Sequence, residues 1–466
     1  LSLSLMAMGV ENGKTVGLEN GRKGGEETAP VVVVKVTGTS RVLPTTKQLD
    51  KKECPLVTFD LPYITFYYNQ KLLVYKGGEY AEMVEKLKEG LGAALEHFYP
   101  LAGKLGKDKE GVLRVECDGE SMLGVEVIEA AAESVEVAEL AEGDAPGVLQ
   151  ELVPYSGIMN LEGLHRPLLA VQLTKLKDGL AIGCAFNHAV LDGQSTWHFM
   201  GAWAELCRGS PTISLSPFHD RTKARATRVK LDLPESAAAH EKGDPAGAPK
   251  PLRAKIFPFS DKAVDRIKSE ANARLTAGAK PLSTFQSLGA HVWRAVCRAR
   301  RLNPEDITVF AIFIDCRRRV DPPMPESYFG NLIQAIFTVT ATGLLLANPP
   351  EFGAGLQQQV IEAHDARAIA GRLEEYEAAP KMFYFRDAGI NCVAVGSSPR
   401  FPVYEVDFGF GKPERVRSGS NNKFDGMMYL YAGRGGGRSI DAEITLDGEA
   451  MENLEKDEEF LMPAAV

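Results

Sequence analysis

The sequence lacks the patterns that would place it at once in several common classes of protein. No Cys-x-x-Cys pair occurs, and the seven cysteines are odd in number and widely spaced, which predicts neither a zinc site nor a disulfide framework. No apolar run approaches the roughly 20 residues of a membrane span, and the best candidate, TVFAIFI at 308–314, has the length of a strand. A basic stripe is also missing, and the net charge of −9 argues against nucleic acid as the main partner.

The composition that is present is typical of a soluble globular protein, with 44% hydrophobic and 25% charged residues. At 466 residues the chain is too long for a single core, so two domains are expected. The N-terminal LSLSLMAMGV has no basic region before it, so no secretory signal is predicted. We expect a cytosolic monomer that acts on a small or acyl substrate. Its cysteines are expected as reduced thiols: Cys54, Cys117, Cys184, Cys207, Cys297, Cys316 and Cys392.

Changes in composition along the chain predict its domain boundaries. Residues 1–29 are rich in glycine and charge, which predicts a disordered leader. Residues 231–252 are rich in Pro, Ala, Gly and charge, as expected of a crossover linker. One domain is therefore predicted for 30–230 and a second for 253–466. Helix and strand patterns are mixed in both, so the predicted fold class is α/β with mixed sheets.

Hydrophobic periodicity predicts the elements that carry the motifs below. Met83, Val84, Leu87, Leu91 and Leu95 recur at helical spacing. Two polar segments, 175–179 and the Gly-rich 433–438, are interpreted as hairpin turns. No helix follows the second, so a phosphate-binding loop is not expected there. Helices are predicted at 80–98, 194–209, 260–272 (capped by Ser260 or Asp261) and 281–300, and strands at 31–36, 112–117, 124–128, 168–174, 179–187, 307–314, 332–340, 391–396, 427–432 and 439–445.

The stretch FNHAVLDG contains a histidine and an aspartate four positions apart, at His188 and Asp192. Spacing alone is weak support for a catalytic pair, since His240 and Asp244 repeat it in the polar linker. Context separates the two copies. His188 ends an apolar strand and Asp192 precedes a helix, whereas His240 has only polar neighbours.

Two arrangements of this motif have different chemical consequences. On a helix, positions i and i+4 would face each other and form a His–Asp dyad. The strand before and the Leu-Asp-Gly after favour a turn, in which Asp192 caps the following helix or pairs with a distant cation. His188 would then stand alone as a general base. From these residues only, a structural histidine is an equally good interpretation.

A nucleophile for covalent catalysis is missing from the sequence around the motif. There is no Gly-x-Ser-x-Gly elbow, and Ser195 falls inside a predicted helix. Cys184 is interpreted as a core residue and not as a reactive thiolate. A lone base without a nucleophile fits direct transfer, in which His188 removes a proton from an acceptor that attacks an activated acyl group.

Five motifs occur in the order and spacing of the plant BAHD acyl-CoA-dependent acyltransferases, which the chain resembles from about residue 30 onward. They are FYPLAGKL (98–105), FNHAVLDG (186–193), PLSTFQSLGAHVWR (281–294), DCRRRVDPPMPESYFGN (315–331) and DFGFGKP (407–413). The resemblance implies two chloramphenicol-acetyltransferase-like domains with a channel between them. Acyl-CoA would enter from one face as a co-substrate and the acceptor from the other, with no bound cofactor and no metal.

The resemblance also implies a role for individual residues. His188 matches the histidine that acts as general base, without an acyl-enzyme. Asp192 matches an aspartate that points away from the channel and pairs with an arginine, here Arg317. Phe410 replaces the family's commoner tryptophan, and the loop around it is expected to be structural and near the CoA side. Structural residues of the motifs are Asp192, Gly193, Arg317, Asp407, Gly409 and Gly411, and expected CoA contacts are Lys280, Ser283 and Thr284.

The function implied by the resemblance is acyl-CoA-dependent O-acyl transfer to a hydroxyl group. Several stretches, among them RSGSNNKFDGMMYLY, look closer still to one member of the family implicated in cutin polyester formation, which implies hydroxylated long-chain acyl groups. One alternative is a hydroxycinnamoyl or amine N-acyltransferase of the same fold, although GSSPRFP lacks the Thr and Trp expected for a shikimate-type acceptor. A non-catalytic accessory of fatty-acid elongation is another.

Overall fold

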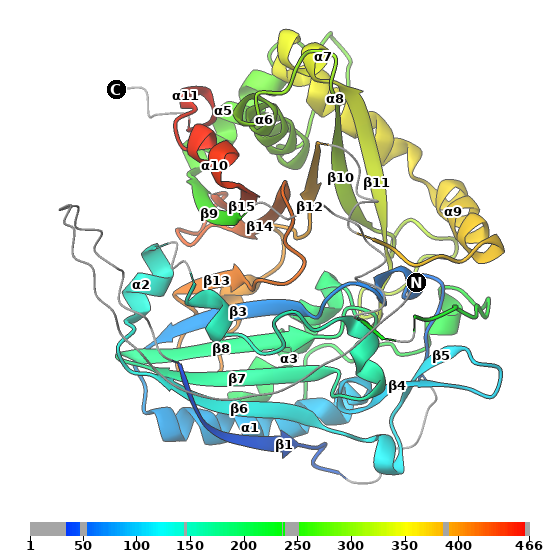
Figure 1. Ribbon diagram of the computed structural model, residues 1–466, viewed down its shortest axis with the longest axis vertical. Coiled ribbons are helices and arrows are strands. Elements are labelled where there is room, and N and C mark those ends of the chain that lie inside the picture. The colour runs from blue at the N-terminus through cyan, green and yellow to red at the C-terminus, as the bar shows by residue number, and fades with distance from the viewer. Residues whose placement is uncertain are drawn as a thin grey trace, which may run out of the picture.

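The computed structural model of the protein describes residues 34–46, 54–143, 147–234, 236–237, 251–384 and 391–461. The predicted leader and most of the predicted linker lie outside these ranges. Two six-stranded mixed sheets, each with its own helices, form the lower and upper parts of Figure 1. This arrangement confirms the predicted α/β class with mixed sheets.

The first sheet has the order β1-β6-β7-β8-β3-β13, and the second β11-β10-β12-β14-β15-β9. The strands of the first are β1 (Lys35–Val42), β6 (Val125–Ala132), β7 (Leu169–Leu176), β8 (Gly179–Phe186), β3 (Asn69–Lys76) and β13 (Arg415–Ser418). Those of the second are β11 (Ile333–Ala341), β10 (Ile307–Asp315), β12 (Cys392–Val395), β14 (Met427–Ala432), β15 (Ile440–Asp447) and β9 (Leu252–Phe259). A small sheet contains β2 (Cys54–Pro55), β5 (Leu113–Glu116) and β4 (Lys104–Lys107).

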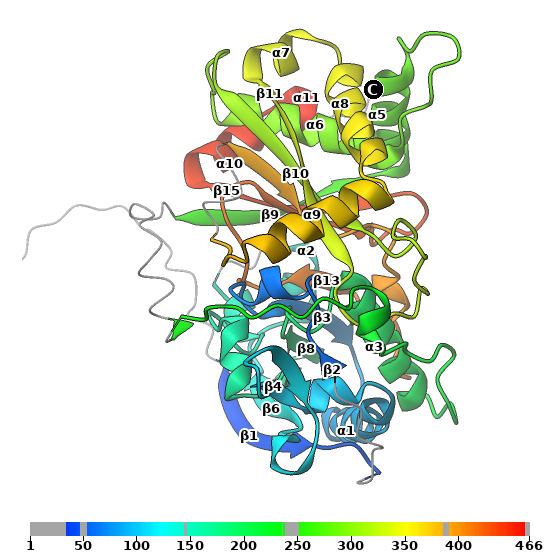
Figure 2. The same ribbon diagram turned by 90° about the vertical axis from the view of Figure 1, so that its right-hand side faces the viewer.

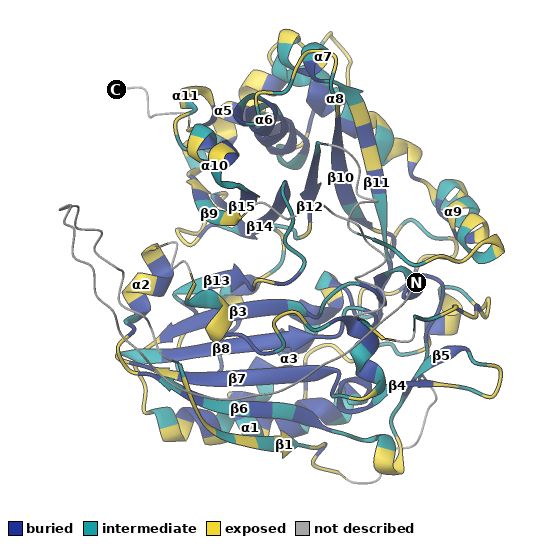
Figure 3. Ribbon diagram, viewed as in Figure 1, coloured by how far each residue is buried: buried dark blue, intermediate teal, exposed yellow. Residues whose placement is uncertain are grey.

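Helices cover the sheets and bury their apolar faces, as the dark core and paler rim of Figure 3 show. Helix α1 carries the predicted stripe inward and packs beside α3 on the first sheet, where the Trp203 indole donates to the Leu87 carbonyl over 3.0 Å. Helices α5, α6 and α8 pack on the second sheet (Figure 2). The helices are α1 (Tyr80–His97), α2 (Val137–Glu142), α3 (Gly193–Cys207), α5 (Asp261–Asn272), α6 (Thr284–Ala299), α7 (Thr342–Ala347), α8 (Pro350–Ala363), α9 (Ala366–Ala378), α10 (Gly448–Leu454) and α11 (Glu458–Leu461).

Most predicted elements agree with the structure to within a few residues. Both predicted hairpins are present, since β7 pairs with β8 and β14 with β15 in antiparallel register. Ser260 is the N-cap of α5, with its hydroxyl accepting from the Ala263 N–H. The predicted first strand differs: its residues 31–33 lie outside the described part, and β1 continues to Val42. The sequence did not predict β3, α8 or α9.

One strand crosses from the second half of the chain into the first sheet. Residues 415–418 form β13, which pairs antiparallel with β3 and places Ser418 opposite Lys71. The predicted division at 231–252 therefore does not hold for these residues. The domain boundaries otherwise remain a prediction.

A long loop of the second half also packs against the first. It follows β10, and its Phe329 N–H donates to the Phe218 carbonyl over 2.9 Å, while the Phe218 N–H donates to Ser327 over 2.8 Å. Strand β3 is central, between β8 and β13, and its alternation places Asn69 and Lys71 on one face. Strand β13 and the loop after β10, both from the second half of the chain, therefore contact the first half. The motif histidine follows β8 in this first half.

Candidate active site

The motif histidine lies in a tight turn between β8 and α3, as the sequence predicted. The Val190 N–H donates to the Asn187 carbonyl over 3.0 Å, and the Ala189 N–H donates to the Asn187 side chain over 3.1 Å. Such an Asx turn satisfies backbone groups that neither a strand nor a helix can satisfy at this position. The residue preceding the histidine therefore builds the turn.

Two further asparagines hold the backbone of His188 from opposite ends of its peptide unit. Its N–H donates to Asn160 Oδ1 over 2.9 Å, and its carbonyl accepts from Asn331 Nδ2 over 2.8 Å. Asn160 comes from the first half of the chain and Asn331 from the loop of the second half. The position of the histidine is therefore fixed by both halves.

The imidazole of His188 lies in an aromatic and half-buried environment. Its ring stacks on Tyr63 at a centroid distance of 4.8 Å and an interplanar angle of 10°, with Phe66 at 6.4 Å. Burial lowers the pKa of His188 below 6.5, and the charge of Lys71 acts in the same direction. Contacts with its own backbone, Asp192 and Asn331 oppose this shift without reversing it. His188 is therefore neutral, and able to accept a proton, at neutral pH.

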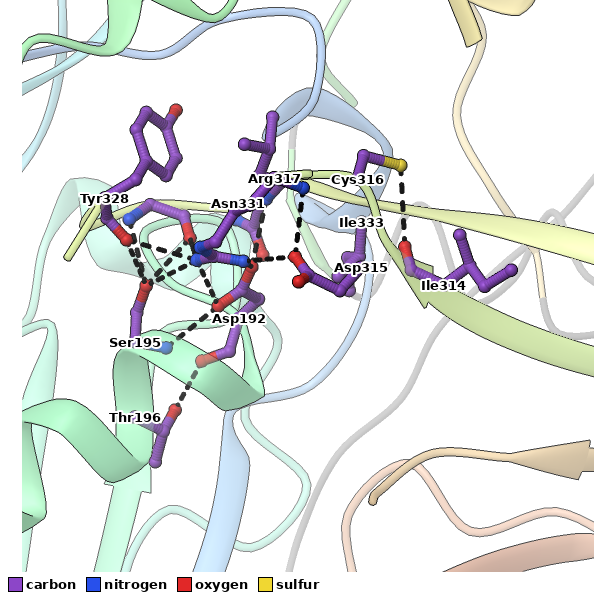
Figure 4. Close-up of polar contacts among 12 residues, drawn as sticks. Asp192, Ser195, Thr196, Ile314, Asp315, Cys316, Arg317, Tyr328, Asn331 and Ile333 are labelled. Atoms are coloured by element: carbon purple, nitrogen blue, oxygen red, sulfur yellow. Dashed lines mark hydrogen bonds and ion pairs between the residues drawn. The ribbon is translucent and has the colours of Figure 1, made fainter. Parts of the chain in front are cut away.

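Asp192 is directed into a buried ion pair and caps α3 (Figure 4). Its Oδ1 accepts from the Ser195 N–H over 2.9 Å, as predicted for an N-cap. Its two oxygens accept from the Arg317 guanidinium over 2.9 and 3.0 Å, and Oδ2 also accepts from the Leu332 N–H over 3.0 Å. With these partners, both oxygens of the carboxylate are occupied, and none of these hydrogen bonds is to His188. The structure thus brings together Asp192 and Arg317, not His188 and Asp192.

The pair is almost completely buried, with side-chain exposures of 0% for Asp192 and 1% for Arg317. Burial alone would raise the pKa of Asp192, but Arg317 and two backbone N–H groups hold it below its usual value. Arg317 also donates to the carbonyls of Tyr328 and Gly330, whereas its buried Nε has no hydrogen-bond partner among the described residues. Most of the donors and acceptors of the pair are therefore satisfied, as the stability of a buried ion pair requires.

A second buried pair supports the turn from the opposite side. Arg221 and Asp60 are both 0% exposed and lie 3.1 Å apart. Arg221 also donates to the Val190 carbonyl of the turn over 2.6 Å, and Asp60 accepts from both nitrogens of Asn331 over 3.1 Å. Through Asn331 this pair also reaches the His188 carbonyl. The sequence contained no indication of this pair.

Two adjoining cavities lie at the site, and His188 lines the smaller of them. The smaller, about 70 Å³, is lined by His188 together with Lys71 and Trp197, and the larger, about 330 Å³, is lined mostly by apolar and aromatic side chains. His188 is thus placed beside a space in the size range of small-molecule sites, about 300–1,000 Å³. The residues that line both cavities are Tyr63, Phe66, Phe313, Ile333 and Phe424.

The DFGFGKP loop is built by hydrogen bonds from Asp407. Its Oδ1 accepts from the Gly409 N–H over 2.7 Å and from the Gly411 N–H over 3.0 Å. Both glycines have positive φ, 97° and 103°, where other residues are strained. The Phe410 ring packs edge-on against Tyr75 at 5.1 Å. None of these residues lines either cavity, and the structural role of the loop near the CoA side remains a prediction.

The remaining predicted residues lie in different places. Gly193 lines the smaller cavity, and a Cβ there would come within 3.0 Å of the Phe401 ring. Ser283 caps α6 in a capping box with Gln286, and the exposed Lys280 pairs with Glu362 at 2.6 Å. Neither Lys280, Ser283 nor Thr284 lines the two cavities, so their contact with CoA remains a prediction.

Other expectations concern metals, thiols and membranes. In the ranges that the structure describes, no group of three or more His, Cys, Asp or Glu side chains could hold a metal ion. All seven cysteines are described and are free. Within the described residues, no helix has the length and apolar character needed to cross a membrane.

Comparisons with known proteins agree with the motifs and the fold. The Transferase family matches residues 32–461. The BAHD acyltransferase DCR of Arabidopsis thaliana is 60% identical over 92% of both chains, and Hydroxycinnamoyltransferase 2 of Oryza sativa subsp. japonica is 31% identical over 85% of this chain and 91% of its own. Among solved structures, F. graminearum TRI101 complexed with coenzyme A and T-2 mycotoxin superimposes with a TM-score of 0.72 at 20% identity, covering 88% of this chain and 99% of its own.

The chain belongs to the BAHD acyltransferases of the Transferase family and is an acyl-CoA-dependent acyltransferase with the predicted chloramphenicol-acetyltransferase-like fold. It is similar to the DCR protein of Arabidopsis thaliana over nearly its full length. The family resemblance inferred from the motifs is therefore confirmed.

Removing the charge of Asp192 should destabilise the protein. In Asp192→Asn the Arg317 guanidinium stays buried without its counter-charge, so the free energy of unfolding should fall by about 3–5 kcal/mol. The measurement is urea denaturation followed by fluorescence. The matched control is Asp315→Asn, which removes the other, half-exposed carboxylate beside Arg317 and should cost less than about 1 kcal/mol. Equal losses in the two variants would contradict this account of the pair.

Proposed function

We propose that the protein transfers an acyl group from CoA directly to a hydroxyl acceptor, with His188 as the general base. The observation that carries this proposal is a neutral histidine on the wall of a cavity with no nucleophile attached to it. Among the described residues, no serine, threonine or cysteine is hydrogen-bonded to the His188 imidazole. The Ser195 hydroxyl contacts the carbonyls of Tyr328 and Gly330, and burial raises the pKa of Cys184.

The proposed reaction needs one base, which first accepts a proton from the acceptor and later donates it to the leaving group. His188 accepts the proton of the acceptor hydroxyl while its oxygen attacks the thioester carbonyl carbon. The tetrahedral intermediate collapses as the carbon–sulfur bond breaks and the ester forms. The proton then passes from the imidazolium to the CoA thiolate, which leaves as the free thiol. No acyl-enzyme is formed, and His188 is returned to its neutral state.

The larger cavity suits the acyl part of the donor. Its wall is formed by side chains such as Phe59, Phe313, Phe337 and Phe383, which favour a long hydrocarbon chain over a polar group. It adjoins the smaller cavity through shared residues, so an acyl chain within it would place its carbonyl carbon near His188. This supports a long-chain acyl-CoA as the donor.

A role in cutin polyester formation follows from the likeness to the DCR protein. At 60% identity over 92% of the chain, this relative supports hydroxylated long-chain acyl groups as substrates. Hydroxycinnamoyl transfer is the second candidate, because Hydroxycinnamoyltransferase 2 is 31% identical. An assay of CoA release with both classes of acyl-CoA distinguishes them, and we expect faster turnover with the long-chain donors. The cytosolic and monomeric state also remain predictions.

Replacing the proposed base should abolish activity without unfolding the protein. His188→Ala removes the imidazole but keeps the backbone bonds to Asn160 and Asn331, so its melting temperature should stay close to that of the wild type. Its rate of CoA release should fall at least about 100-fold, the lower bound for general-base catalysis. The matched control is His240→Ala, which alters the other histidine with the same spacing and should retain full activity. Turnover by His188→Ala equal to the wild type would refute the catalytic role of His188.

The pH dependence of kcat/KM should report the pKa of His188. Since burial lowers that pKa below its ordinary value of 6.5, more than half of the imidazole is neutral at pH 6.5, and activity there should exceed half of its value at pH 7. Activity should fall further at lower pH, where the imidazole becomes fully protonated. Stability should begin to fall there too, because the unfolded state binds the proton more readily. A half-maximal rate at or above pH 6.5, with the loss reversible on return to pH 7.5, would contradict the buried-base account.

A further inference from the structure

Lys71 is a buried cation in the cavity of the proposed base, and the mechanism above does not use it. It is 2% exposed and comes from β3, which pairs directly with the strand that leads to His188. It lines the smaller cavity together with His188. Lysine is seldom buried without an anionic partner, because its ammonium group loses the hydration that stabilises its charge.

The described residues accept only one of the three hydrogen bonds that the Lys71 ammonium group can donate. Its one hydrogen bond among the described residues is to Asn69 Oδ1 over 3.1 Å, and it lies 5.4 Å from the centre of the Tyr429 ring. An ammonium group has three donors, so two hydrogens are left without an acceptor in the described structure. In the described ranges, no carboxylate lies within ion-pair distance of Lys71.

The acidic residue near Lys71, Glu443, forms its ion pair with Lys423. Glu443 is 0% exposed and acts on Lys71 through its charge, but its carboxylate accepts from Lys423 over 2.8 Å and from the Ser418 N–H over 3.0 Å. Burial lowers the pKa of Lys71 to about 8, and Lys423 acts in the same direction, while Glu443 opposes them. At neutral pH most molecules therefore retain a charged Lys71.

A second donor in the same cavity also lacks a partner. Trp197 is 3% exposed and lines the smaller cavity, and its indole N–H has no hydrogen-bond partner among the described residues. Trp197 comes from α3, on the opposite side of the turn from β3. A cation and a neutral donor of different elements thus border the same small space, and each has at least one hydrogen without an acceptor among the described residues.

We propose that Lys71, with Trp197 beside it, binds a carboxylate of the substrate in the cavity next to His188. The inference rests on the proposed acyl transfer and specifies its substrates: one of them carries a free carboxylate in addition to the reacting groups. The carboxylate oxygens accept the hydrogen bonds that Lys71 and Trp197 do not make within the protein. The negative charge of the carboxylate stabilises the ammonium charge of Lys71, which burial deprives of hydration. Two substrates can carry this carboxylate: a hydroxy acid that serves as the acceptor, or a dicarboxylic acyl chain on the CoA donor.

Wild-type enzyme distinguishes these sources. In the first arm, the donor is a fixed monocarboxylic acyl-CoA, and a long-chain hydroxy acid is compared with its methyl ester as acceptor. In the second arm, the acceptor is that methyl ester, and a dicarboxylic mono-CoA ester is compared with the fixed donor. One arm should show a preference of about 10- to 100-fold in kcat/KM for the free carboxylate, as expected of hydrogen bonds to a charged group. The arm that shows it identifies the source.

Lys71→Met should remove this preference selectively. The variant keeps an unbranched side chain of similar length without the charge, so the rate with the free carboxylate should fall to that of the ester, and the ester rate should change less than about threefold. Trp197→Phe, which keeps the ring but not the N–H, should reduce the preference in part. The matched control is Lys175→Met, which removes an exposed lysine of β7 that lines neither cavity and should leave the preference intact.

Activity with the ester keeps the two proposals separate. Turnover of the ester without any carboxylate preference in either wild-type arm would overturn the role of Lys71 and leave the acyl transfer standing. An equal loss with acid and ester in Lys71→Met would also overturn it, since Lys71 would then act on the reaction common to both. Absence of turnover with every substrate would count against the proposed function itself.

Discussion

The buried ion pair between Asp192 and Arg317 is the interaction on which the site depends. It joins the turn after β8 to the loop after β10, two segments that lie 125 residues apart in the sequence. Removing two charges from water costs several kcal/mol for each ion, so the pair stabilises the protein only because its geometry is bidentate and most of its other donors and acceptors have partners. These partners are the Ser195 and Leu332 N–H groups and the Tyr328 and Gly330 carbonyls.

Because Asp192 pairs with Arg317, different residues fix the start of α3 and position the histidine. Asp192 pairs with Arg317 and fixes the start of α3, so its carboxylate is occupied by partners other than His188. The histidine is positioned instead through its backbone, by Asn160 and Asn331, and through stacking on Tyr63. Its side chain therefore remains available to the cavity, which is what a base acting on a bound acceptor requires.

The elements that the sequence predicted well are those with a clear hydrophobic period. The stripe on α1 and the hairpins of β7–β8 and β14–β15 follow from local patterns of apolar and turn residues. Strand β3 was missed because it begins with the polar residues Asn69, Gln70 and Lys71, of which the fold buries Gln70 and Lys71. These polar residues weaken the strand pattern and lie at or next to the proposed substrate cavity.

The candidate site could be predicted only where a motif carried it. His188 and Asp192 were singled out by their context between a strand and a helix, and Arg317 was assigned only through the resemblance to the family. Asn187 and Asn331 stand within the same motifs, at positions whose role becomes visible only in three dimensions. Asp60 and Arg221 have no local pattern, since each is significant only through a partner far away in the sequence. Long-range pairs of this kind cannot be derived from the spacing of residues in one chain.

The most direct test of the central claim is the coupling energy between Asp192 and Arg317. It is obtained from the unfolding free energies of the wild type, Asp192→Asn, Arg317→Met and the double variant. Each single change leaves one partner buried without the other, so the account predicts that the double variant loses less than the sum of the two, by about 2 kcal/mol. Additive losses, within about 0.5 kcal/mol, would show that the two residues stabilise the site independently and would contradict the account.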